Sequence, residues 1–410
     1  LQKLETFRDC FHAQCNATLH HDGLIDQLRN DRYDVMIAET FDQCSMGIYH
    51  LIKPKSLITV STTQLNDYQS YLIGQPILPS HVPAAYGVAV RPDSILSRIE
   101  NIFDMLTAIY SFRQIEAKTD RLFKNLYGPD FPDLGDLTAE STFVLANSDP
   151  FLDFARPTLR KVVEIGGITL RKPKKLEQEW DDILNIRPRT VLVSFGTVAR
   201  ASLIPLHKKK SLVEAFSRFN DTTFIWKYEK PEEKDTFAEQ IDNLILTKWM
   251  PQNDLLGDER VKGIISHAGK GSFFEIASSG KPALLVPIFG DQYRNAASAV
   301  HAGFGILFNK LDLADSQKIT HAISAVLNDP DQQMRADHIK RIMDLRPFKP
   351  RELLVKHLEF AAKMGPQKAL ETEGRTISYI VYYNIDILLG ISFILMITVI
   401  GIAYLILSIL

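Results

Sequence analysis

The sequence predicts an α/β protein with two domains and a C-terminal membrane-spanning helix. The chain has 410 residues, more than one ordinary hydrophobic core accommodates. Its second half alternates short apolar runs with amphipathic stretches, which is typical of a parallel, doubly wound sheet covered by helices on both faces. Residues 387–410 contain no charged side chain, and about 20 consecutive apolar residues suffice to cross a bilayer.

The first half predicts several strands and one long helix. Apolar runs at 33–38, 56–60 and 142–146 are typical of buried strands. Helical periodicity extends from about 94 to 126. We therefore expect a first domain over residues 1–170.

A charged, proline-bearing segment, residues 171–189, predicts a linker that flanks one short helix. The second domain is expected over residues 190–350. Its predicted strands are 191–195, 224–228, 244–247, 263–267 and 283–286. Its predicted helices lie near 207–219, 272–279, 294–301, 316–327 and 331–344.

The end of the chain predicts a membrane anchor. We expect a helix and a juxtamembrane segment over residues 351–384 and a transmembrane helix over 385–410. Tyr379, Tyr382 and Tyr383 precede the apolar run, where an interfacial aromatic belt would lie. The alternative, a buried core helix, is weaker because such helices are usually shorter.

Charge and cysteine content narrow the possible partners. The net charge of −2 argues against a nucleic-acid partner. The three cysteines are Cys10, Cys15 and Cys44, and an odd number leaves at least one unpaired within the chain. Cys10 and Cys15, with His12, His20 and His21, could suggest zinc, but their spacing fits no common structural site, so no metal is expected. The first eleven residues resemble neither a signal peptide nor the opening of a domain, so we expect a fragment or a mature form.

Ligands of a doubly wound sheet bind beyond the carboxyl ends of its strands. Here that rule indicates His267, Gly196-Thr197 and the loop after Pro287. The turn of residues 268–271 connects a strand to a helix, and its free N–H groups and positive helix end suit a phosphate. His267 can donate a hydrogen bond to the same anion. Two glycine turns on one sheet favour a nucleotide over a lone phosphate.

Some of these residues also have purely structural interpretations. Ser272 and Glu275 have the spacing of a capping box, in which Glu275 would reach back to the helix start and bind no ligand. A single histidine such as His267 is often a structural residue. Trp249 could equally belong to the core.

The joint pattern of the second half resembles the UDP-glycosyltransferase family, which conjugates drugs and lipids. It comprises WMPQNDLL (249–256), IISHAG (264–269), FFEIASSGKPALLVP (273–287) and IFGDQ (288–292), in the family's order and near-identical spacing. Further family-like blocks are SHVP (80–83), ANSDPFLDFARP (146–157) and VLVSFGT (191–197). The resemblance covers essentially the whole chain and is strongest to invertebrate, nematode-like members.

The resemblance implies the GT-B fold, in which two Rossmann-like doubly wound domains face a cleft. The C-terminal domain would hold a UDP-sugar and the N-terminal domain a small lipophilic acceptor. Trp249 would stack on uracil, and Gln252 would contact the uracil edge or the ribose. Glu275 would bind the ribose hydroxyls.

The remaining donor residues follow from the same resemblance. His267 and Thr197 would hold the diphosphate, and Asp291 and Gln292 would hold the sugar hydroxyls. Backbone N–H groups of the turn would assist, through Gly269, Gly271 and Ser272. The UDP-sugar is a co-substrate, and no cofactor is expected.

The chain departs from the family pattern at two points. Gly271 occupies a position where relatives often carry Asn, so one side-chain contact to the phosphate or sugar would be missing. The family's catalytic base is a histidine near its N-terminus, oriented by an acid on a later strand. Glu39 matches that acid, at a position where many relatives have Asp. The alternative interpretation is that Glu39 is a surface acid at the end of a strand. The histidine itself is expected upstream of Leu1, since His12 and the histidines after it come too late.

The expected function is transfer of glucuronate or glucose from a UDP-sugar to a lipophilic alcohol, phenol or acid, with inversion. The alternative is a membrane protein that binds UDP-sugar or lipophile without turnover. An unrelated dinucleotide-binding protein is disfavoured because the G-x-G-x-x-G fingerprint is absent.

Sequons at Asn16 and Asn220 suggest lumenal domains on a single-pass protein of the endoplasmic reticulum membrane. The sequence does not select the sugar.

Overall fold

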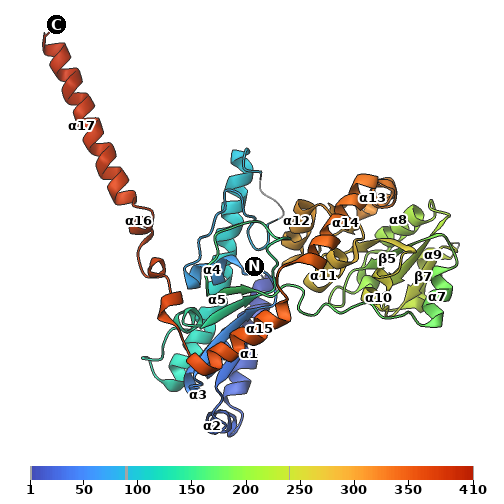
Figure 1. Ribbon diagram of the computed structural model, residues 1–410, viewed down its shortest axis with the longest axis horizontal. Helices are drawn as coiled ribbons and strands as arrows, with labels where there is room; N and C mark the ends of the chain where they lie inside the picture. The colour runs from blue at the N-terminus through green and yellow to red at the C-terminus, as the bar shows by residue number, and fades with distance from the viewer. Residues whose placement is uncertain (1, 88–90, 240, 410) are drawn as a thin grey trace.

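The computed structural model describes residues 2–87, 91–239 and 241–409, arranged as two α/β halves with a helix projecting from one of them (Figure 1). The N-terminal half is built on a four-stranded parallel sheet in the order β1-β2-β3-β4. Its strands are β1 (Val35–Glu39), β2 (Ser56–Ser61), β3 (Phe143–Ala146) and β4 (Val162–Glu164). Its helices are α1 (Gln2–Leu19), α2 (Leu24–Asn30), α3 (Cys44–Ile52), α4 (Asp67–Ile73), α5 (Ile95–Tyr127) and α6 (Leu134–Ala139).

The C-terminal half is built on a six-stranded parallel sheet in the order β10-β9-β8-β5-β6-β7. Its strands are β5 (Arg189–Ser194), β6 (Thr222–Lys227), β7 (Leu244–Thr247), β8 (Val261–Ser266), β9 (Ala283–Leu285) and β10 (Gly305–Leu307). Its helices are α7 (Gln178–Leu184), α8 (Leu206–Phe216), α9 (Asp235–Ala238), α10 (Gln252–Leu256), α11 (Lys270–Ser279), α12 (Gln292–Ala302), α13 (Ser316–Asn328) and α14 (Pro330–Leu345).

The six-stranded sheet is covered on both faces, because successive side chains of each strand point to opposite sides. Leu192 packs in one apolar cluster with residues of α10, α11 and α14. Its neighbours Val191 and Val193 pack in another with residues of α8, α9 and α13. The predicted doubly wound sheet is therefore confirmed. Trp180 and Leu184 of α7, inside the segment expected to be a linker, are buried in the first of these clusters.

The chain returns to the N-terminal half after α14. Helix α15 (Pro350–Met364) packs against all four strands of the first sheet. Its Ala361 is fully buried in a cluster with Ile58, Phe143 and Leu145. Two ion pairs link the halves as well, from Arg294 to Asp153 at 2.8 Å and from Arg346 to Asp149 at 2.7 Å.

The last helices lead away from this body (Figure 1). A short helix, α16 (Tyr379–Tyr382), precedes α17 (Ile385–Ile409), and α17 is long and apolar enough to cross a membrane. None of its side chains is buried in the structure. This agrees with a membrane span and excludes the alternative of a buried core helix.

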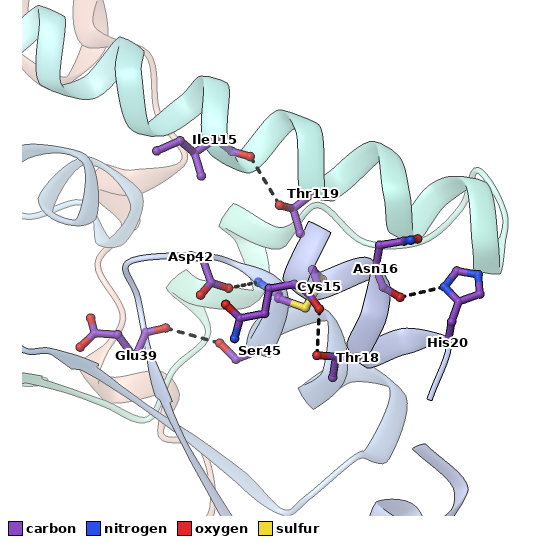
Figure 2. Close-up of a disulfide and its surroundings, with 11 residues drawn as sticks. Cys15, Asn16, Thr18, His20, Glu39, Asp42, Ser45, Ile115 and Thr119 are labelled. Atoms are coloured by element: carbon purple, nitrogen blue, oxygen red, sulfur yellow. Dashed lines mark hydrogen bonds between the residues drawn. A yellow bond between two sulfur atoms is a disulfide. The ribbon is translucent and has the colours of Figure 1, made fainter. Parts of the chain in front are cut away.

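One disulfide bridges the start of the chain. Cys15 in α1 is bonded to Cys44 at the start of α3 (Figure 2). Cys10 is free and exposed. The first residues form an 18-residue helix that packs on α5, which the absence of an apolar run had not suggested. Within the described residues, no cluster of three or more His, Cys, Asp or Glu side chains is arranged to hold a metal ion.

Candidate functional site

Two tight turns lie side by side at the carboxyl edge of the six-stranded sheet. Strands β5 and β8 are neighbours, and Ser194 is paired with Ser266 at their ends. The chain then turns at Gly196, with φ of 89°, and at Ala268, with φ of 62°, a conformation that non-glycine residues rarely adopt. Because the strands are parallel, both turns emerge on the same side of the sheet.

The His267 ring is held between these two turns. A Cβ placed on either Gly196 or Gly269 would lie 2.4 Å from His267 Nε2, so both positions require glycine. Burial lowers the pKa of His267 to about 4, and the imidazole is therefore neutral at physiological pH. Its Nδ1 is buried and has no hydrogen-bond partner among the described residues.

Trp249 lies just beyond β7 at the same edge. Its side chain is 69% exposed, so the alternative that it belongs to the core is wrong. The Thr247 hydroxyl donates to the Trp249 carbonyl at 2.7 Å and holds the backbone there. An exposed indole beside an anion-binding turn suits stacking on a planar base.

Three predicted nucleotide-binding residues form one hydrogen-bonded group. Gln252 Nε2 donates to Ser272 Oγ at 3.0 Å and to Glu275 Oε2 at 2.6 Å. The capping-box interpretation is wrong, because α11 begins at Lys270 with Gly269 as its N-cap, so that Ser272 lies inside the helix. Burial raises the pKa of Glu275, and the hydrogen bond from Gln252 opposes that rise.

Lys227 adds a cation to this edge that the sequence interpretation had missed. Its Nζ donates to the Gly196 carbonyl at 2.8 Å and to Thr197 Oγ1 at 3.1 Å, and it lies 5.1 Å from the centre of the Trp249 ring. Thr197 and Trp249 are thus joined through one ammonium group. A charged residue at the end of strand β6, directly after Phe224, Ile225 and Trp226, was the available signal.

Lys270 is a second missed cation, inside the turn itself. Its Nζ lies 3.3 Å from Asn295 Oδ1 and 3.4 Å from Gln64 Oε1, and Gln64 belongs to the N-terminal half. Burial lowers the pKa of Lys270 to about 8, against the attraction of Asp153 and Asp291. Lys270 therefore places a titratable ammonium between the halves.

The loop that follows β9 is held by its own side chains. Gln292 is buried, and its Oε1 accepts hydrogen bonds from the backbone N–H groups of Ile288 and Phe289 at 2.8 and 3.1 Å. Only its amide NH2 is left to donate to a ligand. Asp291 Oδ2 accepts from Asn295 Nδ2 at 2.7 Å, which connects Asp291 with Lys270 through one asparagine.

Gly269, Gly271 and Ser272 lie at or within the first turn of α11, where backbone N–H groups are free. A Cβ on Gly271 would meet no atom within 4 Å, unlike one on Gly269. The turn therefore has open space on the side where relatives are expected to carry a larger residue.

Glu39 is the last residue of β1 in the N-terminal half. Its Oε1 accepts from the Thr40 N–H at 2.9 Å and its Oε2 from the Thr62 N–H at 3.1 Å. Burial raises the pKa of Glu39, while these hydrogen bonds lower it. In the described part of the chain, no histidine side chain is hydrogen-bonded to Glu39. The structure thus orients this carboxylate without pairing it to a base.

The site combines groups that suit a nucleoside diphosphate. An exposed indole, a half-buried carboxylate, a neutral histidine, two lysines and a helix N-terminus lie along one edge of one sheet. Of the residues predicted from the sequence, the edge brings together Thr197, Trp249, Gln252, His267, Gly269, Gly271, Ser272, Glu275, Asp291 and Gln292. Asn295 was also missed, and nothing in the sequence signalled its contacts.

Comparison with known proteins agrees with this geometry. The family model described as UDP-glucoronosyl and UDP-glucosyl transferase matches residues 1–410. The putative UDP-glucuronosyltransferase ugt-48 of Caenorhabditis elegans is 28% identical over 388 residues, which cover 94% of this chain and 74% of that protein. Human UDP-glucuronosyltransferase 1A5 is 25% identical over 378 residues, covering 92% and 69% respectively.

Solved structures share the fold. The kitacinnamycin glycotransferase superposes with a TM-score of 0.58 and 19% identity over 85% of this chain and 82% of that one. LpCGTa, solved in complex with UDP, gives a TM-score of 0.53 and 16% identity over 88% and 80%. These neighbours are GT-B glycosyltransferases, and the expected GT-B arrangement of two parallel-sheet halves is confirmed.

Proposed function

Because the chain belongs to the UDP-glucoronosyl and UDP-glucosyl transferase family, it is a UDP-glycosyltransferase, and we propose that it transfers glucuronate or glucose to a small lipophilic alcohol, phenol or acid with inversion. One observation carries the donor side of this proposal: the neutral His267 ring is fixed between the turns of Gly196 and Gly269, at the start of α11.

The donor would lie along the edge from Trp249 to Asp291. Trp249 stacks on uracil, and the Gln252–Glu275 pair binds the uracil edge and the ribose hydroxyls. His267, Thr197 and the N–H groups of the turn hold the diphosphate. Asp291 and the free NH2 of Gln292 bind the sugar hydroxyls.

The diphosphate leaving group gains one negative charge as the sugar bond breaks. Lys227 and Lys270, with the positive end of α11, are close enough to this edge to balance that charge. Transfer on this account needs neither a metal nor a cofactor. We expect that a chelator leaves turnover unchanged.

In the reaction, the acceptor oxygen attacks the anomeric carbon from the face opposite UDP. The bond from that carbon to the β-phosphate oxygen breaks, and the acceptor proton passes to a base. In this proposal Glu39 accepts a hydrogen bond from a histidine base and stabilises the imidazolium that forms. The two backbone N–H groups that hold its carboxylate would fix its direction.

The decisive experiment is UDP release by the full chain in membranes. UDP-glucuronate and UDP-glucose are each offered with a panel of phenols, alcohols and acids, and the anomeric configuration of the product is read by NMR. We expect His267→Ala to lower kcat/KM by about 100-fold or more. The matched control is His321→Ala, an exposed residue of α13. Full turnover by His267→Ala would overturn the proposal.

We also propose that α17 anchors the protein in the endoplasmic reticulum membrane with both halves in the lumen. The Cys15–Cys44 disulfide favours an oxidising compartment. Asn220 is exposed in a turn before β6, whereas Asn16 lies within α1, where the hydroxyl of its sequon residue Thr18 is bonded to the Gln14 carbonyl.

Glycosylation tests this orientation. We expect endoglycosidase to increase gel mobility in the wild type and in Asn16→Gln, but not in Asn220→Gln. No change in the wild-type protein would contradict the lumenal assignment.

A further inference from the structure

One loop of the N-terminal half touches both the candidate acid and the candidate donor edge. This loop, residues 62–65, follows β2 and is here named the β2 loop. At its start, the Thr62 N–H donates to Glu39 Oε2 at 3.1 Å. Two residues later, Gln64 Oε1 lies 3.4 Å from Nζ of Lys270, at the start of α11 in the other half. The same short loop therefore fixes both contacts.

The backbone of the β2 loop is itself held by hydrogen bonds. Asn147, which follows β3, donates from its Nδ2 to the Thr62 carbonyl at 2.8 Å and from its N–H to the Thr63 carbonyl at 3.0 Å. The Thr63 hydroxyl donates to the Gln64 carbonyl at 3.0 Å. Because three successive carbonyls accept these bonds, the Gln64 side chain extends from a fixed backbone.

The Lys270 ammonium has one amide oxygen from each half beside it. Gln64 Oε1 lies 3.4 Å and Asn295 Oδ1 3.3 Å from its Nζ. Gln64 is buried, so water competes little for its amide. The rings of Phe273 and Phe274 lie 4.8 and 5.3 Å from the same Nζ. An ammonium group has three N–H donors, so two directed at amides leave one for an anion.

Four charged side chains also face Lys270. The carboxylates of Asp149, Asp153 and Asp291 attract its charge, and the guanidinium of Arg294 repels it. Asp153 is paired with Arg294 at 2.8 Å. Within the described residues, Lys270 forms no ion pair with these carboxylates, and its hydrogen-bond acceptors are the two amides. The direction of its ammonium is therefore set by the amides rather than by the charges.

We propose that Gln64 is a positioning residue for the donor diphosphate, supplied by the N-terminal half. It holds the Lys270 ammonium so that one N–H remains for the diphosphate, and the β2 loop fixes that ammonium relative to the Glu39 carboxylate. The group that balances the donor charge and the acid that orients the base are thus aligned by one loop. The inference rests on the proposed function, because it assigns Lys270 to the diphosphate.

The test measures UDP binding by the full chain in detergent micelles, by calorimetry at pH values between 7 and about 9.5. Wild type is compared with Gln64→Glu and Gln64→Leu below the melting transition of each protein. The matched control is Gln332→Leu, since Gln332 is also a buried glutamine and lies in α14, which contributes no residue to the donor edge.

We expect the wild-type affinity for UDP to fall as the pH rises through about 8, where Lys270 loses its charge. Gln64→Glu places a carboxylate beside the ammonium and favours its charged form, so the midpoint of this fall should rise by about one pH unit. Gln64→Leu removes an acceptor, so the midpoint should move to lower pH and UDP should bind about tenfold more weakly at pH 7. Gln332→Leu should keep the wild-type midpoint.

An unchanged midpoint in both Gln64 variants would overturn the inference, because a purely structural role would weaken UDP binding equally at every pH. A wild-type affinity that is constant over this pH range would overturn it as well. In either case, UDP binding by the wild type would leave the proposed function in place. If the wild type bound no UDP, the proposed function and this inference would both be wrong.

Discussion

The two halves of the molecule present their functional groups in different ways. In the C-terminal half, the candidate donor residues follow the ends of parallel strands and meet at one edge of one sheet. Of the predicted site residues, Glu39 occupies such a position in the N-terminal half, and a cavity beside α5 is lined by α4, α5 and the segment before α17. A sheet edge presents backbone groups and short turns, which suit a ligand whose nucleotide part is always the same. A cavity between helices is shaped by side chains, which suit a variable apolar molecule.

The largest effect is expected from removing the disulfide, which belongs to the N-terminal half alone. Cys44→Ser opens a link spanning 29 residues, and we expect it to lower the free energy of unfolding by about 3–4 kcal/mol. UDP affinity below the melting transition should stay within about twofold, because the donor edge lies in the other half. Thermal melts and calorimetric UDP titration measure both, with Cys10→Ser as control. If Cys44→Ser also weakened UDP binding below the melting transition, the two halves would not be independent.

The next effect tests recognition by the backbone at the sheet edge. Gly269→Ala forces a methyl group against His267 Nε2, whereas Gly271→Ala adds the same group where no atom lies within 4 Å. We expect about a 100-fold loss of kcat/KM for Gly269→Ala and less than a twofold change for Gly271→Ala. Steady-state kinetics measure kcat/KM for the two variants and for the wild type. Similar losses in both would mean that the His267 ring is not the element that the glycine protects.

A smaller effect is expected at the exposed indole. Trp249→Ala removes stacking on the base, worth about 1–3 kcal/mol, so UDP should bind roughly tenfold more weakly or worse. Leu311→Ala is the matched control, since both side chains are 69% exposed. Titration with UDP and with inorganic diphosphate separates base from phosphate recognition. Equal weakening for both ligands would contradict a stacking role.

The smallest effect concerns the contact between the halves. The pKa of Lys270 is lowered to about 8, so its amine is charged below that pH and becomes neutral above it. Donor kcat/KM should therefore fall by roughly fivefold as the pH rises from 7 to 9. Lys270→Met should lower the value at pH 7 and remove this decline. His267, with a pKa of about 4, adds no inflection between pH 6 and 9. A pH profile unchanged in Lys270→Met would assign the decline to another group.

The sequence predicted the regular parts of this molecule better than the points where distant segments meet. Strand β7 was predicted with its observed bounds, and α5 within one residue at each end, because their apolar patterns are long or well delimited. Strands β4 and β10 have three residues each, too few to show a period. Helix α1 has no continuous apolar run and depends on its packing against α5.

The site follows the same division. Trp249, Gln252, His267 and Glu275 could be grouped because the edge of a parallel sheet collects whatever follows each strand. The contact of Lys270 with Gln64 joins residues that lie 206 positions apart, and no local pattern encodes such a contact. The rotation of the His267 ring depends on two glycines in separate turns, which sequence spacing alone cannot orient.

The return of α15 to the first sheet makes the C-terminal half a continuous insertion within the other half. A cut before Pro350 would strip Leu353, Leu354, Leu358 and Ala361 from the apolar cluster around Ile58 and Phe143, and would expose the N-terminal sheet rather than the donor edge. A cut after Met364 would keep these four residues in the cluster, but it would remove Leu370 from its edge and Glu371 from its ion pair with buried Lys161. Helix α17 therefore follows a segment that packs on the N-terminal half. The C-terminal half is encoded by one uninterrupted stretch of the gene and could be deleted as such.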